Sequence, residues 1–172
     1  PISTTHKNIG KTVLETPQDL YDALNAEFSF GLDVCALPYN AKCPRFYSPE
    51  QDGLKQPWDA NCWCNPPFDR SMGTWVRRCY EAAQAGHTAV VLIHGNYHDT
   101  QWWHDYAMKA SEIRYLRGRP KFHDGDYTAA LRTMVAVFRP KCQGPPICVS
   151  IDRTGRRLAP NPQLTDAKRS VQ

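Results

Sequence analysis

Residues 88–99 read Thr-Ala-Val-Val-Leu-Ile-His-Gly-Asn-Tyr-His-Asp. The first six form an uninterrupted apolar run rich in β-branched residues, which is typical of a strand in a parallel sheet buried on both faces. A polar loop from His94 to Asp99 follows at the carboxyl end of that strand, where open α/β sheets bind their ligands. This stretch therefore predicts an α/β fold with a candidate site at one edge of the sheet.

Helices and strands are predicted to alternate on both sides of this run. Thr16 as N-cap and Pro17 as first helical residue predict a helix that extends to about Glu27. Other predicted strands lie at 30–36, 61–64, 112–116 and 131–138, and other predicted helices at 75–86 and 100–110. This alternation predicts a three-layer α/β sandwich with a mostly parallel sheet, in which late strands are antiparallel.

The length of 172 residues is suited to one globular domain. We predict a flexible arm at 1–12, a main domain at 13–140 and an irregular, basic, proline-rich extension at 141–172. A polar N-terminus and the lack of a long apolar run predict a cytoplasmic protein with no membrane partner. The seven cysteines lack the spacing of a disulfide framework or a zinc site, so no metal is predicted.

The stretch Asn65-Pro66-Pro67-Phe68 follows the predicted strand at 61–64. Two consecutive prolines fix φ and remove two backbone donors, so the segment forms a stiff elbow. It places an amide side chain, backbone carbonyls and an aromatic face close together, an arrangement that suits a planar amine-bearing group. The alternative reading is an ordinary loop in which prolines end a strand.

Asp33 is the single charged residue of the apolar segment 30–36. A carboxylate among such neighbours is costly to bury without partners. It therefore acts either in a turn or as a ligand contact at the end of its strand. Ligands are expected where Asp33, the elbow and the loop after Ile93 converge.

Taken together, these stretches resemble the phage-type DNA adenine methyltransferase family. The matching stretches run from about 16 to 140. In order they are Thr-Pro-Gln-Asp-Leu-Tyr-Asp-Ala-Leu-Asn-Ala-Glu-Phe at 16–28, Leu-Asp-Val-Cys-Ala at 32–36, Asn-Ala-Lys-Cys-Pro at 40–44, Asp-Gly-Leu at 52–54, Trp58, the elbow, Asp99-Thr100 with Trp102-Trp103, Glu-Ile-Arg at 112–114 and Gly-Arg-Pro-Lys-Phe at 118–122.

The resemblance implies a Rossmann-like methyltransferase fold, S-adenosylmethionine as cofactor and DNA as partner, in the cytoplasm of a bacterial host. It implies that Thr16, Pro17 and Asp33 face the methionine end of the cofactor and that the segment Asp52-Gly53-Leu54 lies near its adenine. The implied cofactor-binding residues are Thr16, Pro17, Asp33, Cys35, Ala36, Asp52 and Leu54. A homodimer is compatible with the sequence.

The elbow then has an implied role in transferring a methyl group to the N6 amine of adenine. The Asn65 side-chain oxygen and the Pro66 carbonyl would each accept one amine hydrogen. Pro67 completes the turn, and Phe68 would stack on a base flipped out of the duplex. The loop 94–98 differs from the family pattern, so a contact from His94 or His98 and a solvated loop both stay open.

Basic residues follow the elbow and the predicted strand at 112–116. A phosphate track and a solvated face are both compatible with this set, and we favour the track, made of Arg70, Arg114, Arg117, Arg119 and Lys121. The chain has no room for a large target-recognition domain, which predicts short or lax sequence specificity unless a dimer or the tail from Pro140 supplies contacts. The alternatives are a catalytically silent DNA-binding or antirestriction module, or an amine methyltransferase acting on RNA, cytosine or protein glutamine.

Overall fold

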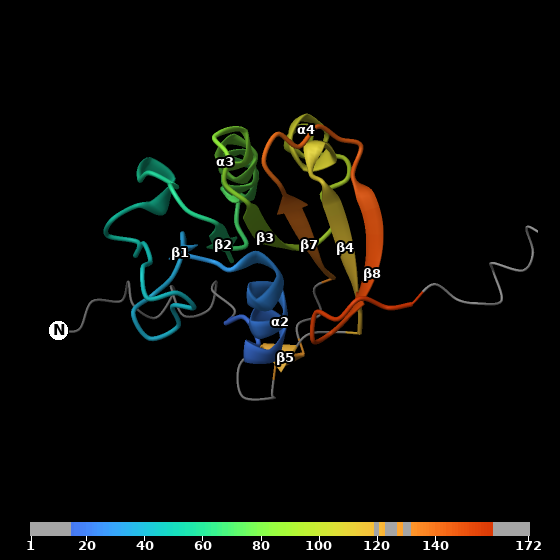
Figure 1. Ribbon diagram of the computed structural model, residues 1–172, viewed down its shortest axis with the longest axis horizontal. Helices are drawn as coiled ribbons and strands as arrows, with labels where there is room; N and C mark the ends of the chain where they lie inside the picture. Colours follow the sequence, from blue (N-terminus) through green and yellow to red (C-terminus); the bar gives the residue numbers. More distant parts are fainter. Residues whose placement is uncertain (1–14, 119–120, 123–126, 129–131, 160–172) are drawn as a thin grey trace, which may run out of the picture.

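The computed structural model describes residues 15–118, 121–122, 127–128 and 132–159. Its centre is a six-stranded sheet in the order β1-β2-β3-β7-β4-β8 (Figure 1). The strands are β1 Leu32–Asp33, β2 Cys62–Cys64, β3 Ala89–His94, β4 Glu112–Arg117, β7 Thr133–Phe138 and β8 Ile147–Asp152. β7 runs antiparallel to both of its neighbours, while the other pairings are parallel. The predicted Rossmann-like sandwich with a late antiparallel strand is confirmed.

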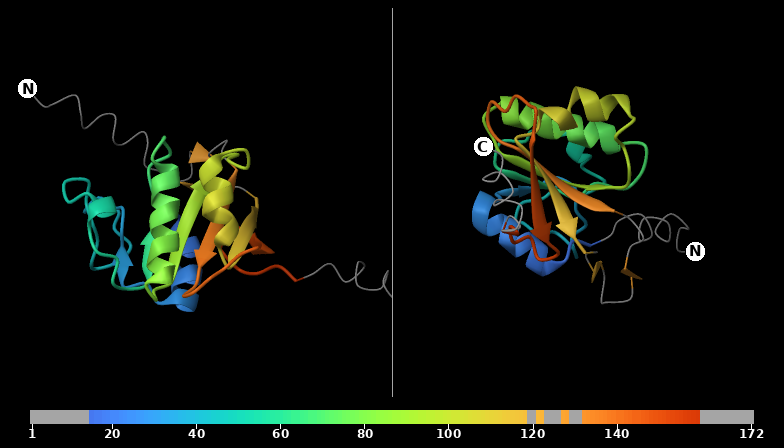
Figure 2. Two further views of the ribbon diagram at one scale, coloured as in Figure 1. Left: turned by 90° about the horizontal axis from the view of Figure 1, so that it is seen from above. Right: turned by 90° about the vertical axis from the view of Figure 1, so that its right-hand side faces the viewer.

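Helices cover both faces of the sheet, as Figure 2 shows in the view from its side. One face carries α2, Gln18–Phe28, and the other carries α3, Met72–Gln84, with α4, Gln101–Asp105. Short 3₁₀ turns η1 and η2 occupy Gly53–Lys55 and Ala107–Lys109, and a separate two-stranded ladder pairs β5, Lys121–Phe122, with β6, Tyr127–Thr128. No described helix is both long and apolar enough to cross a membrane.

The alternation of side chains along β3 separates two apolar cores. Val90 and Leu92 pack against the α2 side, while Val91 and Ile93 pack against the side of α3 and α4. All four side chains are fully buried. The uninterrupted apolar run from which the fold was predicted is thus explained by a central strand with two covered faces.

Two helix predictions need correction. α2 begins at Gln18, so Pro17 occupies the N-cap position in place of Thr16. The helix predicted for 100–110 divides into α4 and η2, because Tyr106 takes the non-helical angles φ −128° and ψ −53°. The arm predicted at 1–12 and the residues after Ala159 lie outside the described part of the chain.

The irregular extension predicted from residue 141 is wrong for β8. This strand pairs with β4 in parallel along its whole length, from Ile147 beside Glu112 to Asp152 beside Arg117. Ile151 is fully buried in the core on the α2 side. The strand was missed because its short alternating pattern lies between segments rich in Pro and Arg.

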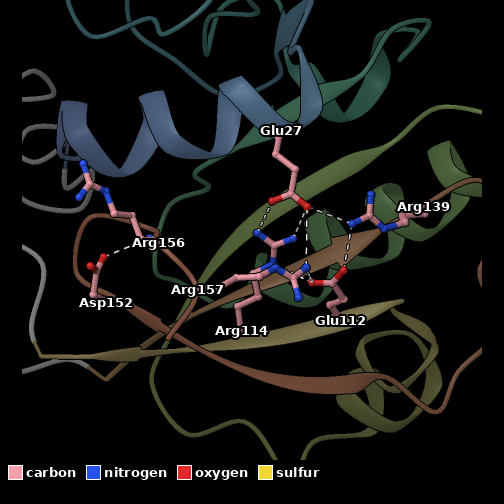
Figure 3. A network of polar contacts seen from close by, with 7 residues as sticks. All are labelled: Glu27, Glu112, Arg114, Arg139, Asp152, Arg156 and Arg157. Atoms are coloured by element: carbon pink, nitrogen blue, oxygen red, sulfur yellow. Dashed lines mark hydrogen bonds and ion pairs between the residues drawn. The ribbon is translucent and has the colours of Figure 1, made fainter. Parts of the chain in front are cut away.

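A network of ion pairs ties this C-terminal segment to the rest of the domain (Figure 3). Glu27, at the end of α2, accepts two hydrogen bonds of 2.7 Å from Arg114. Glu112, at the start of β4, accepts from Arg114 and Arg157 at 2.8 Å and from Arg139 at 2.9 Å. Arg157 follows β8, so the network joins α2, β4, β7 and the C-terminal segment at the edge where the parallel strands begin.

Candidate active site

The predicted site residues gather where the parallel strands end. Asp33 is the last residue of β1, and Asn65 directly follows β2. β3 runs parallel to β2, so the loop after His94 opens at the same edge. Because neighbouring strands in a sheet lie about 5 Å apart, these three strand ends form one continuous rim.

The elbow is anchored to the entrance of α2. The Asn65 side-chain nitrogen Nδ2 donates a hydrogen bond of 3.1 Å to Thr16 Oγ1, and both residues are buried. This contact joins residues that are 49 positions apart in the sequence. Because Thr16 holds the donor end of the amide, the acceptor oxygen Oδ1 takes a fixed orientation in the site.

The rest of the elbow connects the sheet to α3. Pro66 is buried, while Pro67 and Phe68 are half-buried, and Phe68 packs against the core on the α3 side. Asp69 then accepts hydrogen bonds from the backbone nitrogen and the hydroxyl of Ser71, which precedes α3. The ring of Phe68 is thus fixed in position with part of its surface open.

Asp33 is a buried carboxylate, only 2% exposed. It accepts hydrogen bonds from the backbone nitrogens of Lys42, at 2.9 Å, and Cys35, at 3.3 Å. Burial outweighs these bonds and raises the pKa of Asp33 to about 6. The carboxylate is therefore still mostly ionised at neutral pH. A bound cation would reduce the free-energy cost of keeping this charge buried.

A small pocket joins Asp33 to the elbow. Its space of about 10 Å³ has room for about one water molecule. An ammonium group has a similar size, so the pocket fits the amino end of the cofactor that the resemblance implies. The lining residues are Glu15, Thr16, Asp33, Cys35, Asn40, Lys42, Trp63 and Asn65.

The segment Asp52-Gly53-Leu54 lies directly against the end of β1. A Cβ atom on Gly53 would lie 2.0 Å from the carbonyl oxygen of Val34, so only glycine allows this approach. The Gly53 carbonyl in turn accepts a 2.8 Å hydrogen bond from the Trp58 indole. Asp52 and Leu54 are thereby held beside the strand that carries Asp33. Their contact with the cofactor stays a prediction.

Pro17 and Ala36 complete the predicted cofactor set. Pro17 is half-buried at the start of α2, next to the pocket residue Thr16. Ala36 is buried, and its backbone nitrogen bonds to the Tyr47 carbonyl at 3.0 Å. Neither side chain lines the small pocket, whereas Cys35, from the same predicted set, does.

The predicted phosphate track is only partly compatible with the structure. Arg70 and Arg117 are exposed at the edge where the parallel strands end. Arg114 is 1% exposed and is bound to two carboxylates, so its predicted phosphate contact is corrected to a structural role. Arg119 lies outside the described residues, and only the backbone of Lys121 is described, in β5.

Sequence reasoning missed a second, larger pocket at the same edge. It encloses about 500 Å³ above the ends of β3 and β4. The loop after β3 contributes Asn96 and His98, and the segment before β7 contributes Arg132, which was not predicted as a site residue. Only the pairing of β7 between β3 and β4 brings these residues together, and no local sequence signal indicates it. The side chain of His94 lies outside the described part of the structure.

Comparison with known proteins adds a family match. The model of the family described as DNA N-6-adenine-methyltransferase (Dam) matches residues 3–143 of this chain. The DNA N-6-adenine-methyltransferase of Haemophilus phage HP1 (strain HP1c1) is 29% identical over 113 residues, which cover 64% of this chain and 65% of that protein. The protein of the same description from Escherichia phage T1 is 28% identical over 104 residues, which cover 59% of this chain and 43% of that protein. The matched regions thus span less than two thirds of these relatives.

Proposed function

The chain belongs to the DNA N-6-adenine-methyltransferase (Dam) family, and from this premise we propose that it transfers a methyl group from S-adenosylmethionine to the N6 amine of adenine in DNA. The observation that carries the proposal is the hydrogen bond from Asn65 to Thr16, which fixes the elbow beside the Asp33 pocket. An amine-binding motif and a cation-binding carboxylate therefore share one edge of the sheet.

The elbow supplies two acceptors for the amine. The lone pair of the adenine amine is delocalised into the adenine ring, which makes this nitrogen a poor nucleophile. Asn65 Oδ1 and the Pro66 carbonyl would each accept one of its hydrogens and so concentrate electron density on the nitrogen. Phe68 would hold the flipped base by stacking on its ring. The methyl transfer then depends on the orientation of the amine more than on a strong base.

Residues on the cofactor side would fix the position of the methyl donor. When bound, S-adenosylmethionine supplies an electrophilic methyl group on a sulfonium sulfur. Asp33 would pair with its ammonium group in the small pocket, and Asp52 and Leu54 would contact its adenine end. The acceptors of the elbow and the carboxylate of Asp33 lie on neighbouring strand ends, which supports one shared reaction site.

Radiolabelled S-adenosylmethionine tests the proposal directly. Purified protein is incubated with the labelled cofactor and unmethylated DNA, and the DNA is digested to nucleosides. We expect label in N6-methyl-2′-deoxyadenosine. Label in another nucleoside would indicate a different amine substrate, and no label in DNA would contradict the proposed reaction.

The buried carboxylate of Asp33 predicts a pH dependence of cofactor binding. Its folded pKa of about 6 lies above the ordinary value, so the ionised form that binds a cation is lost as the pH falls through 6. We expect full affinity above pH 7 and a fall approaching about tenfold per pH unit below 6. Isothermal titration calorimetry between pH 5 and 8 measures this fall.

Asp33→Asn is the control for that measurement. It should bind the cofactor weakly at every pH and lose the dependence between pH 5 and 8. The raised pKa means that the folded state binds this proton more tightly than the unfolded state, so the contribution of Asp33 to stability falls as the pH rises toward 6. The amide of Asp33→Asn keeps only one of the two acceptors, so at pH 7 the lost hydrogen bond opposes the gain in stability from removing the buried charge. An unchanged pH profile in the variant would exclude Asp33 as the titrating group.

Arg117 provides a test of DNA contact at the carboxyl edge. Arg117→Ala should weaken binding to DNA of any sequence and reduce the slope of log affinity against log salt by about 0.9, the value for one phosphate contact. Fluorescence anisotropy over a range of salt concentrations measures this slope. The control is Lys109→Ala, which removes an exposed charge from η2, before the start of β4. Equal slopes for the two variants would remove Arg117 from the proposed track.

A further inference from the structure

The indole of Trp63 is a buried hydrogen-bond donor without a protein partner. Trp63 is the middle residue of β2, and its side chain is fully buried. Its ring nitrogen Nε1 has no hydrogen-bond partner among the described protein groups. A tryptophan N–H can only donate, and buried polar groups in folded proteins are almost always hydrogen-bonded. The unpaired donor therefore indicates an acceptor that comes from outside the described chain.

Neighbouring aromatic rings hold this indole in place. The Tyr21 ring meets it edge-on with ring centroids 5.8 Å apart, and the centroid of the Phe30 ring lies at 5.7 Å. The Tyr21 hydroxyl is itself paired with Cys43 Sγ at 3.3 Å. Because protein cores are closely packed, the indole has little room to turn toward another protein group. Its N–H therefore keeps one direction.

Trp63 also lines the small pocket, beside the buried carboxylate of Asp33. The two residues are paired in register on the parallel strands β1 and β2, so their side chains are neighbours on the same face of the sheet. Asp33 accepts and Trp63 donates, so the pocket offers one polar group of each kind. Asn40 and Lys42 also line the pocket and are half-exposed, so a ligand can enter from their side.

A carboxylate and a donor side by side are complementary to an α-amino acid. Such a molecule carries an ammonium group and a carboxylate on the same carbon atom, as does the methionine end of S-adenosylmethionine. Asp33 would pair with the ammonium group, and the carboxylate would accept from Trp63 beside it. The Lys42 side chain, whose Nζ donates to the exposed Gln18 at 2.8 Å, forms one wall of the pocket. A rotation of this flexible side chain would widen the pocket for the second group.

We propose that the Trp63 indole donates a hydrogen bond to the carboxylate of the bound cofactor and makes the protein discriminate against cofactors that lack this group. The inference rests on the proposed function, because it assigns a further residue to the same cofactor site. A hydrogen bond to a charged acceptor is stronger than a neutral one, and burial protects it from competing water. Its loss should therefore lower the affinity for the cofactor by about tenfold to a hundredfold.

Two cofactors that differ only in this carboxylate test the assignment. Isothermal titration calorimetry compares S-adenosylmethionine with decarboxylated S-adenosylmethionine on the parent protein and on Trp63→Phe. Phenylalanine keeps an aromatic ring in the core but has no donor. We expect Trp63→Phe to weaken binding of S-adenosylmethionine by about tenfold or more and to leave the affinity for the decarboxylated cofactor nearly unchanged. An equal loss for both cofactors would show a structural role of Trp63 and overturn the inference.

Two control variants separate this role from a changed core or a lost charge. Trp75→Phe removes another buried indole, whose Nε1 donates to Ser71 Oγ on the side of α3, and should leave the ratio of the two affinities unchanged. Lys42→Met removes a cation from the pocket wall and tests the rival assignment of the carboxylate to that cation. Lost discrimination in Lys42→Met, with full discrimination in Trp63→Phe, would overturn the inference.

Nuclear magnetic resonance on the parent protein tests the same bond without a core substitution. With isotope-labelled tryptophan, the indole N–H signal of Trp63 should move downfield when S-adenosylmethionine binds, and it should move less with the decarboxylated cofactor. An equal response to both cofactors would indicate that water, and not the carboxylate, accepts from Trp63, and would overturn the inference. If the parent protein binds neither cofactor, the proposed function itself is contradicted.

Discussion

Asn65→Ala is expected to lower methyl transfer to adenine by about 10²–10³-fold, the range observed when one preorganised hydrogen-bonding group is removed from an active site. The variant loses one of the two proposed acceptors for the amine and leaves the Pro66 carbonyl as the other. It also loses the hydrogen bond to Thr16 that orients the amide. Single-turnover kinetics with saturating DNA and cofactor measure the effect on the chemical step.

Cofactor binding distinguishes this role from a structural one. Asp33 belongs to β1 and keeps its backbone hydrogen bonds in the variant, so affinity for S-adenosylmethionine should change little. Asn65→Asp retains an acceptor oxygen and should retain more activity than Asn65→Ala. If Asn65→Ala instead loses cofactor affinity and transfer to the same extent, the residue acts in the cofactor site and not on the amine.

The parts of the fold that could be predicted carry strong local signals. The run of apolar residues in β3 is typical of a strand whose two faces are covered, and it lies at the centre of the sheet. Pro66 and Pro67 end β2 because neither can donate to a sheet ladder. These signals arise from neighbouring residues, so no tertiary information is needed to interpret them.

The missed features depend on contacts between distant residues. Thr16 has the residue type and position of a helix N-cap, yet its hydroxyl accepts from Asn65, and only the packing of α2 on the sheet brings the two together. β8 lies in a segment whose composition favours irregular structure, but it gains six paired positions along β4. Tertiary context outweighs local propensity in both cases.

The role of Arg114 also depends on contacts that the sequence does not show. In the sequence it lies in a basic stretch with Arg117, which favoured a common role for the two. Side chains alternate along β4, so these residues point to opposite faces of the sheet. Arg114 faces α2 and meets Glu27 and Glu112, whereas Arg117 reaches solvent. The partners come from residues far away in the sequence, and spacing alone could not indicate them.

Arg114→Ala is expected to lower the free energy of unfolding by about 3 kcal/mol, the lower end of the cost of breaking a buried ion pair. The side chain is 1% exposed and donates to both Glu27 and Glu112, and its guanidinium lies 5.0 Å from the ring centroid of Phe28. Its loss leaves the nearly buried Glu112 with Arg139 and Arg157 alone, both of which are more exposed. These remaining partners are the reason for expecting the lower end of the range. Urea unfolding measures the change.

Arg117→Ala is the matched control, since it removes the same charge from the same strand at an exposed position. Its free energy of unfolding should stay within about 0.5 kcal/mol of the parent, as for most surface substitutions.

The ion-pair network around Arg114 also predicts that stability depends on acid pH. Hydrogen bonds from Arg114 lower the pKa of Glu27, and the surrounding arginines outweigh burial to lower that of Glu112. This stabilisation is therefore full above the pKa of an unfolded glutamate, and it is lost as the pH falls through the lowered values. The gap between Arg114→Ala and the parent should narrow at acid pH. A gap that stays constant down to pH 2 would show that packing around Phe28, and not charge pairing, accounts for the cost.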